Sequence, residues 1–288
     1  MKHILVCPFQ EELISQLNGK DLVIRLNDIY NIERVANIVN NRNNLHCALV
    51  NTKYSLASIS FKDNWQNIPI ALYVSDMGSF LEMLTKITIL RQLNIRIYLS
   101  ENLEHVYTNI MLLSSLGIYT GLAFDQKNSD WESINNLMHY AIYGKSKHAP
   151  IEPFHYIASN YRINKPTDFG SVYFDDPRKY LHVSEAGNVA LSNKELQSKV
   201  FVSNSLNNLE NIENSQDYVE RINAWRDFFI KPDGCAYCQG WRICLGKFSD
   251  RPNSQKKDCE KFFVDLMEAS EYFQSRQQEK KACGHYNI

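Results

Sequence analysis

The sequence predicts an α/β protein in which parallel strands alternate with helices. Two observations carry this prediction. In the first part of the 288-residue chain, six short runs rich in β-branched and aromatic residues alternate with stretches whose apolar residues recur at helical spacing. Strands separated by helices pair in parallel, because each helix carries the chain back to the starting edge of the sheet. The later part of the chain follows another pattern and carries most of the cysteines.

The expected strands are apolar runs bounded by polar or turn residues: His3–Phe9, Leu22–Leu26, Cys47–Asn51, Ile70–Val74, Ile95–Ser100 and Tyr119–Phe124. The helices expected after them lie at Gln10–Leu17, Ile29–Asn40, Phe80–Leu93, Leu103–Leu116 and Trp131–Tyr143. Helix ends carry their own signals. Ser79 with Glu82, and Ser129 with Glu132, form capping boxes. Gly117 follows a helix, as glycine does at helix C-termini.

Right-handed crossovers leave two architectures for these units, a doubly wound open sheet or a partial or complete barrel. The spacing of the strands does not separate the two. Neither a Gly-x-Gly-x-x-Gly motif after the first strand nor a phosphate loop is present, so the usual nucleotide-binding fingerprints are missing.

The pattern changes after the proline-containing connection Lys145–Pro153. Further strands are expected at Phe154–Ser159 and Ser171–Phe174. A hairpin is expected where Gly187-Asn188 separates two strand-like runs. The hairpin strands and the later helices are expected at Tyr180–Val183, Val189–Leu191, Leu206–Ile212, Asp217–Phe229 and Asp258–Lys281.

The composition argues against several classes of protein. Apolar residues make up 44% and charged residues 22%, as in globular domains, which excludes disorder for most of the chain. Lys and Arg number 31 and Asp and Glu 32, so the net charge of −1 argues against binding nucleic acid or an anionic membrane. No apolar run approaches the ~18 residues of a membrane span. The opening segment shows no cleavage site of an export signal, so we expect the cytoplasm.

Four of the seven cysteines, Cys235, Cys238, Cys244 and Cys259, lie close together in the sequence. In the reducing cytosol such a group indicates a metal or redox site before it indicates disulfides. The spacing Cys-x2-Cys-x5-Cys-x14-Cys suits a tetrahedral zinc ion or one [4Fe–4S] cluster, since both take four thiolates. Zinc ribbons usually present two short knuckles and this chain has one, which favours the iron–sulfur cluster. Cys259 is expected at a helix start, where the helix dipole favours its thiolate.

Other candidate residues have simpler interpretations. Cys7 and Cys47 sit in apolar runs and are expected to be buried core thiols. Asp76, Ser100–Glu101 and Asp125 follow predicted strands, where barrel enzymes place catalytic groups. Polar residues at such positions are more often caps or turns, so the sequence identifies no catalytic residue.

The residues around the four cysteines resemble a known family. The stretch reads Gly-Cys-Ala-Tyr-Cys-Gln-Gly-Trp-Arg-Ile-Cys-Leu-Gly-Lys-Phe, followed later by Asp-Cys-Glu-Lys-Phe-Phe. It resembles the SPASM region, the C-terminal extension of radical SAM peptide maturases and sulfatase maturases. The resemblance implies that one auxiliary [4Fe–4S] cluster is held by Cys235, Cys238, Cys244 and Cys259.

The same resemblance implies that two other clusters of the family are absent. Phe248 and Ser192 stand at positions that hold cysteines of a second auxiliary cluster in the family. The chain also lacks the Cys-x3-Cys-x2-Cys motif that the family carries after its first barrel strand. We therefore expect no reductive cleavage of S-adenosylmethionine, and no radical SAM activity by this chain alone.

With this resemblance, the strand–helix units are interpreted as a partial (β/α)6 TIM-like barrel at residues 1–165. A small SPASM-like α+β domain is expected at residues 166–288. The resemblance implies a non-radical accessory protein, or maturase partner, in the biosynthesis of ribosomally made, post-translationally modified peptides. It would bind a precursor peptide or a partner enzyme, either an ATP-grasp ligase or a radical SAM maturase, and neither nucleic acid nor membrane.

Two alternatives stay open at this point. The first is an enzyme that uses the barrel with an active site free of cysteine. The second is an interaction module stapled by zinc at the same four cysteines and unrelated to that family.

Overall fold

The computed structural model describes residues 3–124, 129–224, 234–249 and 253–284. Contacts divide the chain into two compact units, each built from two stretches of sequence. Unit 1 comprises Met1–Leu103 and Tyr173–Ala224, and unit 2 comprises Glu104–Val172 and Trp225–Ile288. This division differs from the boundary at residue 165, which stays a prediction.

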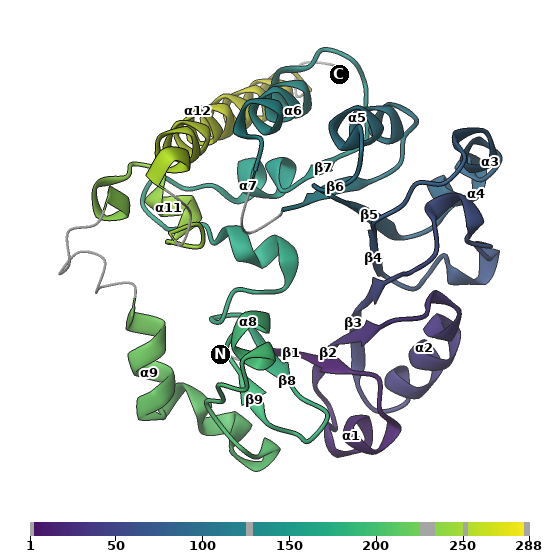
Figure 1. The fold of residues 1–288 in the computed structure, drawn as a ribbon, viewed down its shortest axis with the longest axis vertical. Coiled ribbons are helices and arrows are strands. Elements are labelled where there is room, and N and C mark those ends of the chain that lie inside the picture. Colours follow the sequence, from purple (N-terminus) through teal and green to yellow (C-terminus); the bar gives the residue numbers. More distant parts are fainter. Residues whose placement is uncertain (1–2, 125–128, 225–233, 250–252, 285–288) are drawn as a thin grey trace. The chain divides into compact units, whose positions relative to one another are not determined.

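The strands of unit 1 form a mostly parallel sheet in the order β5-β4-β3-β2-β1-β8-β9 (Figure 1). Strands β1 to β5 lie side by side in chain order and pair in parallel, β8 pairs in parallel with β1, and only β9 is antiparallel to its neighbour. Their bounds are β1 (Ile4–Pro8), β2 (Asp21–Leu26), β3 (Asn44–Asn51), β4 (Ile70–Val74), β5 (Ile95–Ser100), β8 (Tyr180–Val183) and β9 (Val189–Ala190).

The helices that join β1 to β5 lie on one side of these strands, as right-handed crossovers between successive neighbours require (Figure 1). These helices are α1 (Glu11–Gln16), α2 (Ile32–Asn40), α3 (Phe80–Leu84) and α4 (Ile87–Gln92), with short 3-10 turns η1 (Ile29–Asn31), η2 (Leu56–Ser58) and η3 (Asp63–Trp65). The second stretch of unit 1 adds α8 (Asn193–Gln197), the 3-10 helix η5 (Leu206–Asn214) and α9 (Gln216–Asn223).

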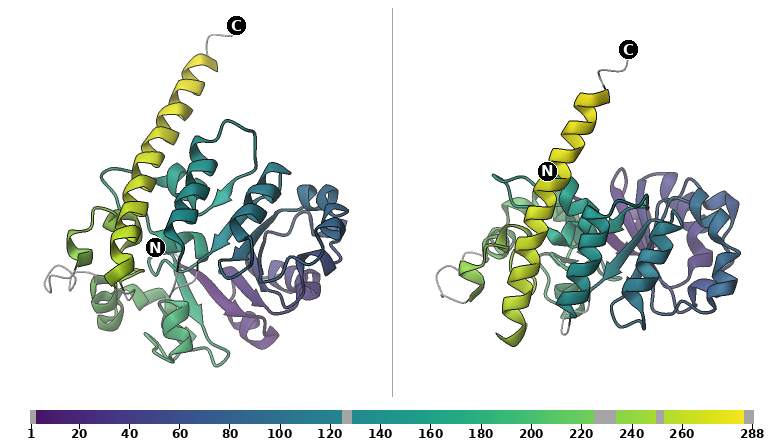
Figure 2. Two further views of the ribbon diagram at one scale, coloured as in Figure 1. Left: turned by 45° about the horizontal axis from the view of Figure 1, so that its top comes forward. Right: turned by 90° about the horizontal axis from the view of Figure 1, so that it is seen from above.

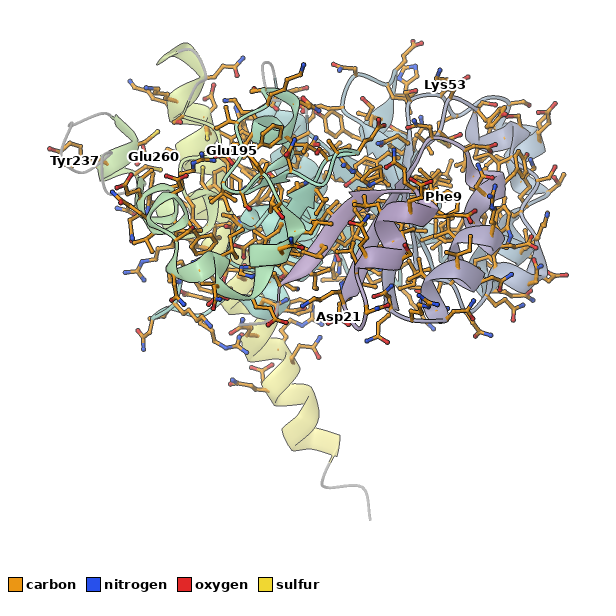
Figure 3. The ribbon with its side chains drawn as sticks, turned by 90° about the horizontal axis from the view of Figure 1, so that it is seen from below. Phe9, Asp21, Lys53, Glu195, Tyr237 and Glu260 are labelled. Atoms are coloured by element: carbon orange, nitrogen blue, oxygen red, sulfur yellow. The ribbon has the colours of Figure 1, made fainter. Side chains whose placement is uncertain are left out.

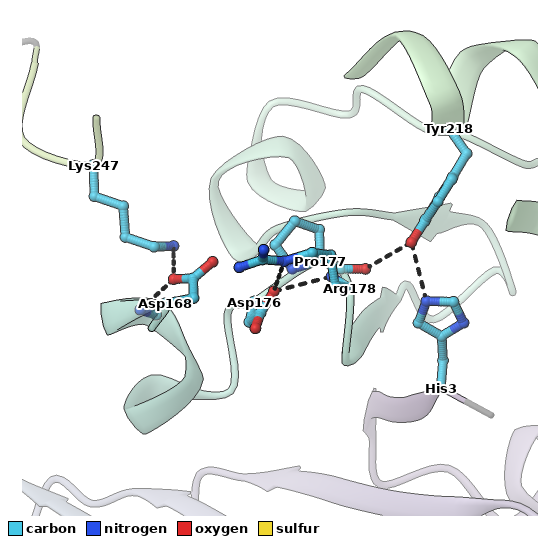
Figure 4. Close-up of polar contacts among 8 residues, drawn as sticks. His3, Asp168, Asp176, Pro177, Arg178, Tyr218 and Lys247 are labelled. Carbon is cyan, nitrogen blue, oxygen red and sulfur yellow. Dashed lines mark hydrogen bonds and ion pairs between the residues drawn. The ribbon is translucent and has the colours of Figure 1, made fainter. Parts of the chain in front are cut away.

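A buried polar contact attaches α9 to the first strand. The Tyr218 hydroxyl lies 3.3 Å from His3 Nε2 and donates to the Pro177 carbonyl oxygen at 3.4 Å (Figure 4). His3 Nδ1 lies 3.5 Å from Glu213 Oε1. Burial lowers the pKa of His3 more than the nearby Glu213 carboxylate raises it. These contacts account for the buried position of a histidine at the start of β1.

The two faces of the unit 1 sheet differ in chemistry. Side chains in register point to the same face, and successive residues alternate between faces. One face is apolar and buried, and its residues are Leu5, Leu22, Ile24, Ala48, Ile70, Leu72, Ile95 and Ile97. We assign this face to the helices, because α1 and α2 bury apolar side chains of their own. The opposite face carries polar groups, namely Arg25, Tyr73, Arg96, Tyr98 and His182.

Unit 2 contains the short parallel pair β6 (Thr120–Ala123) and β7 (Ile151–Glu152). Its helices are α5 (Val106–Ser115), α6 (Trp131–Tyr143), α7 (Phe154–Asn160), α11 (Trp241–Cys244) and α12 (Asn253–Gly284). Its 3-10 turns are η7 (Gly234–Tyr237) and η4 (Phe169–Tyr173), of which the last residue belongs to unit 1. Helix α12 packs along α6 and α7, and its C-terminal part extends past both (Figure 2). Among the described residues, no helix combines the length and the apolar character needed to cross a bilayer.

The structure confirms the α/β class, the six strands of the first part and the hairpin, whose Gly187 has φ of +79°. The barrel and the SPASM-like domain are finer statements that stay predictions. Two expected strands are wrong. Phe154–Ser159 lies in helix α7, and Ser171–Phe174 lies mostly in the 3-10 turn η4.

The helix expectations need smaller corrections. Phe80–Leu93 is two helices separated at Thr85-Lys86, and Leu206–Ile212 is 3-10 rather than α-helical. Asp217–Phe229 begins as α9, but its residues after 224 lie outside the described part of the chain. The last helix begins at Asn253 rather than at Asp258.

Candidate metal centre

The four predicted ligands lie in unit 2 on three neighbouring elements. Cys235 lies in η7, Cys238 follows it, Cys244 ends α11, and Cys259 lies inside α12. Cys244 is buried, and the other three are partly exposed. Because α12 begins at Asn253, the expectation that Cys259 stands at a helix start is wrong, and the helix dipole does not select its thiolate.

Cys244 and Cys259 are in direct contact, although they come from different helices. The pKa of Cys244 is lowered chiefly because the Cys259 thiol donates a hydrogen bond to its sulfur. Burial opposes this effect, and backbone N–H groups of Phe248, Gly246 and Lys247 reinforce it. Three successive N–H groups directed at one sulfur form a small anion-binding concavity. The fold therefore favours the thiolate at Cys244.

The chain geometry after α11 produces this concavity. Leu245 has φ of +50° and Gly246 has φ of +79°, so two successive residues take the left-handed conformation. That conformation turns the chain back over Cys244, and a glycine at the second position adopts it without a Cβ clash. The glycine directly after Cys244-Leu245 thus allows the turn that brings the following N–H groups to the Cys244 sulfur.

Cys235 and Cys238 complete the group from the other side. The pKa of Cys238 is raised to about 11, mainly by burial, and the charges of Cys244 and Cys235 contribute to the rise. All four sulfurs thus lie in one neighbourhood. Among the described residues, however, no three His, Cys, Asp or Glu side chains are arranged at distances that would hold one metal ion. The structure brings the predicted ligands near one another without closing them around a common centre.

Helix α12 sets the position of the Cys235–Cys238 knuckle. Gly240 follows the knuckle and packs so tightly that a Cβ there would lie 2.3 Å from Phe263 Cβ. The same Cβ would lie 3.5 Å from Cys238 Sγ. Only glycine fits this approach, so Gly240 fixes the distance between the knuckle and the helix that carries Cys259.

Backbone and charged contacts join the segment around Cys244 to residues 163–170. The Arg242 carbonyl accepts from the Thr167 N–H at 3.0 Å, and Arg242 Nη1 donates to the Ile163 carbonyl at 2.6 Å. Lys247 Nζ lies 3.8 Å from Asp168 Oδ1 (Figure 4), and the same oxygen accepts from the Gly170 N–H at 2.7 Å. These contacts hold the α11 segment in place on unit 2.

Phe248 lies in an aromatic cluster next to this segment. It is 8% exposed, and its ring centroid is 5.5 Å from that of Trp131, 5.6 Å from Phe263 and 5.7 Å from Phe169. Phe248 therefore serves as core packing. Ser192 caps α8 by accepting from the Glu195 N–H at 3.1 Å. Both residues that the resemblance compares with cysteines have structural roles of their own.

Part of the group is accessible from outside. Tyr237 is 77% exposed, and Figure 3 shows its side chain directed outward at the edge of the structure. Cys235 and Cys238 on either side of it are partly exposed. The knuckle is thus the accessible end of the group, and Cys244 is its buried end.

The expectation for Cys7 and Cys47 is confirmed. They lie on β1 and β3 of unit 1, with exposures of 0% and 6%. Burial raises the pKa of each thiol to about 12. A neutral, enclosed thiol is neither a nucleophile nor a metal ligand, so these two cysteines are core residues.

The polar residues after the strands of unit 1 form turns. Asp76 Oδ1 accepts from the Gly78 N–H at 2.9 Å, and Ser100 Oγ accepts from the Asn102 N–H at 3.3 Å. Asp125 lies outside the described residues. The sequence interpretation does not identify the polar face of the unit 1 sheet. The sequence signal for that face is a charged residue inside a buried apolar run, as Arg25 is in Asp-Leu-Val-Ile-Arg-Leu.

Comparison with protein families, with curated proteins and with solved structures finds no match for this chain.

Proposed function

We propose that this chain is a non-radical, SPASM-like accessory protein in the maturation of ribosomally made peptides, acting in the cytoplasm. Cys235, Cys238, Cys244 and Cys259 would hold one [4Fe–4S] cluster. The observation that carries the proposal is the grouping of these four thiols, from three elements, in one region of unit 2. The two other thiols described by the structure are buried in β-strands of unit 1.

The donor set suits such a cluster. Its ligands are thiolates, and N–H groups directed at a ligand sulfur stabilise the negative charge that the cluster shares with its ligands. Cys244 has this environment. When bound, the cluster would supply either one-electron transfer or a cross-link between α11 and α12. The chain itself contributes the sulfurs, the N–H groups and the aromatic residues that keep water from the buried side.

The fold of unit 1 supports the barrel part of the proposal. Five strands in chain order, with their helices on one side, are what a partial (β/α) barrel needs at its start. A polar face opposite the helices also suits a barrel, whose functional groups point inward. The same polar face favours the second candidate, an enzyme with a cysteine-free active site.

Metal content is the first test. The purified full-length chain is reconstituted anaerobically with iron and sulfide, then examined by metal analysis, absorbance and EPR after reduction. We expect about four irons and four sulfides per chain, as one [4Fe–4S] cluster requires. One tightly bound zinc with neither iron nor sulfide would reject the cluster and leave the zinc-stapled module.

Variants identify the ligands. Cys235→Ser, Cys238→Ser, Cys244→Ser and Cys259→Ser are each expected to lose most of the bound iron, because serine does not replace a thiolate in a soft-ligand site. Cys47→Ala is the matched control, since Cys47 is buried on β3. Equal iron in Cys259→Ser and Cys47→Ala would remove Cys259 from the ligand set.

The peptide part of the proposal has a separate test. We expect the gene to lie beside one for a short precursor peptide and one for an ATP-grasp ligase or radical SAM maturase. The purified chain should then bind that peptide, measured by fluorescence anisotropy with a scrambled peptide as control. Binding to neither the peptide nor the neighbouring enzyme would contradict the accessory role.

A further inference from the structure

Unit 1 contains a buried histidine whose hydrogen bonding is incomplete. His182 lies on β8 and is 3% exposed, and among the described residues neither of its buried ring nitrogens has a hydrogen-bond partner. Nε2 lies 3.3 Å from Asp175 Oδ1, which is within ion-pair distance but not aligned as a hydrogen bond. A buried polar atom without a partner costs free energy. The arrangement therefore calls for a partner outside the chain.

Arg25 presents a second incomplete group on the same face. Arg25 on β2 is in register with Pro8 on β1, and His182 on β8 is in register with Val6. Val6 and Pro8 are two residues apart, so the side chains of Arg25 and His182 lie on the same face of the sheet. Arg25 Nη2 donates to the Val183 carbonyl oxygen at 2.7 Å. The guanidinium thus reaches across β1 to the residue next to His182. Its Nε is buried without a hydrogen-bond partner.

These two groups are matched by one kind of ligand. The Arg25 Nε–H is always a donor. His182 beside the Asp175 carboxylate can hold a proton on each nitrogen, and Nδ1–H is then a second donor. Asp175 is itself held in place, since its Oδ1 accepts from the Asn193 N–H at 2.9 Å. Two buried donors require an acceptor, and an oxyanion supplies one with the charge that Arg25 favours.

The position and charge of the site point the same way. Arg25 and His182 lie toward the carboxyl ends of parallel strands, where α/β proteins place their ligands. Arg96 stands on the same face, in the row that runs from Arg25 through β3 and β4. Asp175 lies beside His182, and the charge of Glu185 acts on Arg25. Arg25 and Arg96 thus place two guanidinium groups on this face.

We propose that the polar face of the unit 1 sheet binds an oxyanion, a carboxylate or phosphate group of a small ligand, through Arg25 and His182. Asp175 positions His182. The site uses no cysteine and does not depend on the metal centre proposed above.

The test is anion binding by the full-length chain at fixed pH and ionic strength. Inorganic phosphate and acetate are titrated separately, with chloride as the ionic-strength control. Binding is followed by calorimetry and by the ring ¹⁵N signals of His182 in NMR. We expect saturable binding of one of the two anions with a shift of the His182 signals, and the tighter anion identifies the ligand class.

Variants test the assignment of the donors. His182→Gln and Arg25→Gln are each expected to weaken binding about tenfold or more, the usual effect of losing one hydrogen bond to a charged group. His46→Gln on β3 and Arg34→Gln on α2 are matched controls, since both side chains are exposed. Cys244→Ser should bind the anion as the unmodified chain does.

Two results would overturn the proposal. One is the absence of saturable binding of either anion. The other is binding that leaves the His182 signals unshifted, which places the anion elsewhere. If either site variant fails to fold, the His182 signals of the unmodified chain still decide the question.

Discussion

Gly240 occupies a position that accepts no side chain. It lies between the candidate ligands Cys238 and Cys244 in the sequence, and its Cα packs against Cβ of Phe263 on α12. A hydrogen atom fits there and a methyl group does not. A single position therefore controls how closely the knuckle approaches the helix.

Gly240→Ala tests that control. We expect a loss of about 1–3 kcal/mol in the free energy of unfolding, as for an overpacked core, because the clash is with Phe263 Cβ rather than with a flexible side-chain end. Chemical denaturation measures the loss, and reconstituted iron should fall with it. Gly19→Ala is the control, since a Cβ at Gly19 would have no neighbour within 4 Å. It should keep its iron, although its positive φ costs some stability.

A second single residue, His155, makes the free energy of unfolding depend on pH. Burial lowers the pKa of His155, and this outweighs the hydrogen bond with the Ile151 carbonyl, which raises it. The folded state thus binds a proton less readily than the unfolded state, whose histidine titrates near about 6.5. The stability that the neutral, buried His155 contributes is fully present above that pH. It is lost as the pH falls from the unfolded pKa toward the lowered pKa of the folded state.

We therefore expect the free energy of unfolding to fall between about pH 7 and pH 5, and His155→Gln to make that fall shallower. Urea denaturation at a series of pH values measures the slope. His105→Gln should leave it unchanged, because the His105 side chain is 77% exposed. An equal slope in the chain with and without His155 would contradict the assignment.

At the scale of the element, helix ends show where sequence signals and structure differ. The C-terminus of α5 follows its signal, since Gly117 has φ of +83° and the Gly117 and Ile118 N–H groups bond back to Ser114 and Leu113. The predicted capping boxes do not form. The N-cap of α6 is Asp130, whose carboxylate accepts from the Ser133 N–H at 3.1 Å. Ser79 is the N-cap of α3 but makes no side-chain capping bond.

The cap of α6 yields a direct comparison. Asp130→Ala is expected to cost about 1 kcal/mol, the usual value of an N-cap. Glu132→Ala, at the position that a capping box would use, should cost less than about half of that. Thermal unfolding of both variants measures the difference. A larger loss of stability in Glu132→Ala than in Asp130→Ala would instead support the capping box of Ser129 and Glu132.

The wrong strand predictions also have local causes. Phe154–Ser159 is a short apolar run, whose period does not distinguish a strand from a buried helix, and Pro153 before it is well suited to a helix start. At Ser171–Phe174, the Asp168 carboxylate accepts from the Gly170 N–H and opens a 3-10 turn, and Phe174 has φ of +57°, which a strand does not allow. Side-chain-to-backbone bonds thus override β propensity there.

For the whole molecule, the division into two units determines which part of the chain a bound metal would stabilise. Every proposed ligand lies in unit 2, and none lies in the unit 1 sheet. A metal that binds only the folded state stabilises the part that carries its ligands.

Hydrogen exchange tests this division. On reconstitution we expect the backbone amides of α11 and α12 to exchange at least about tenfold more slowly, and those of β1 to β5 to change little. Cys244→Ser should show no slowing in α11. Equal slowing throughout the described residues would mean that the two units unfold together.

The sequence by itself determined the alternation of strands and helices, the hairpin at Gly187, the core thiols Cys7 and Cys47, and the set of candidate ligands. These follow from periodicity, turn chemistry and spacing, which are local properties of the chain. Only the tertiary structure decided that Cys244 contacts Cys259. It also decided that Gly240 meets Phe263, and that Arg25 reaches the residue beside His182. Each of these contacts joins residues whose distance depends on how the elements pack, and packing is set by burial across the whole fold rather than by any one segment.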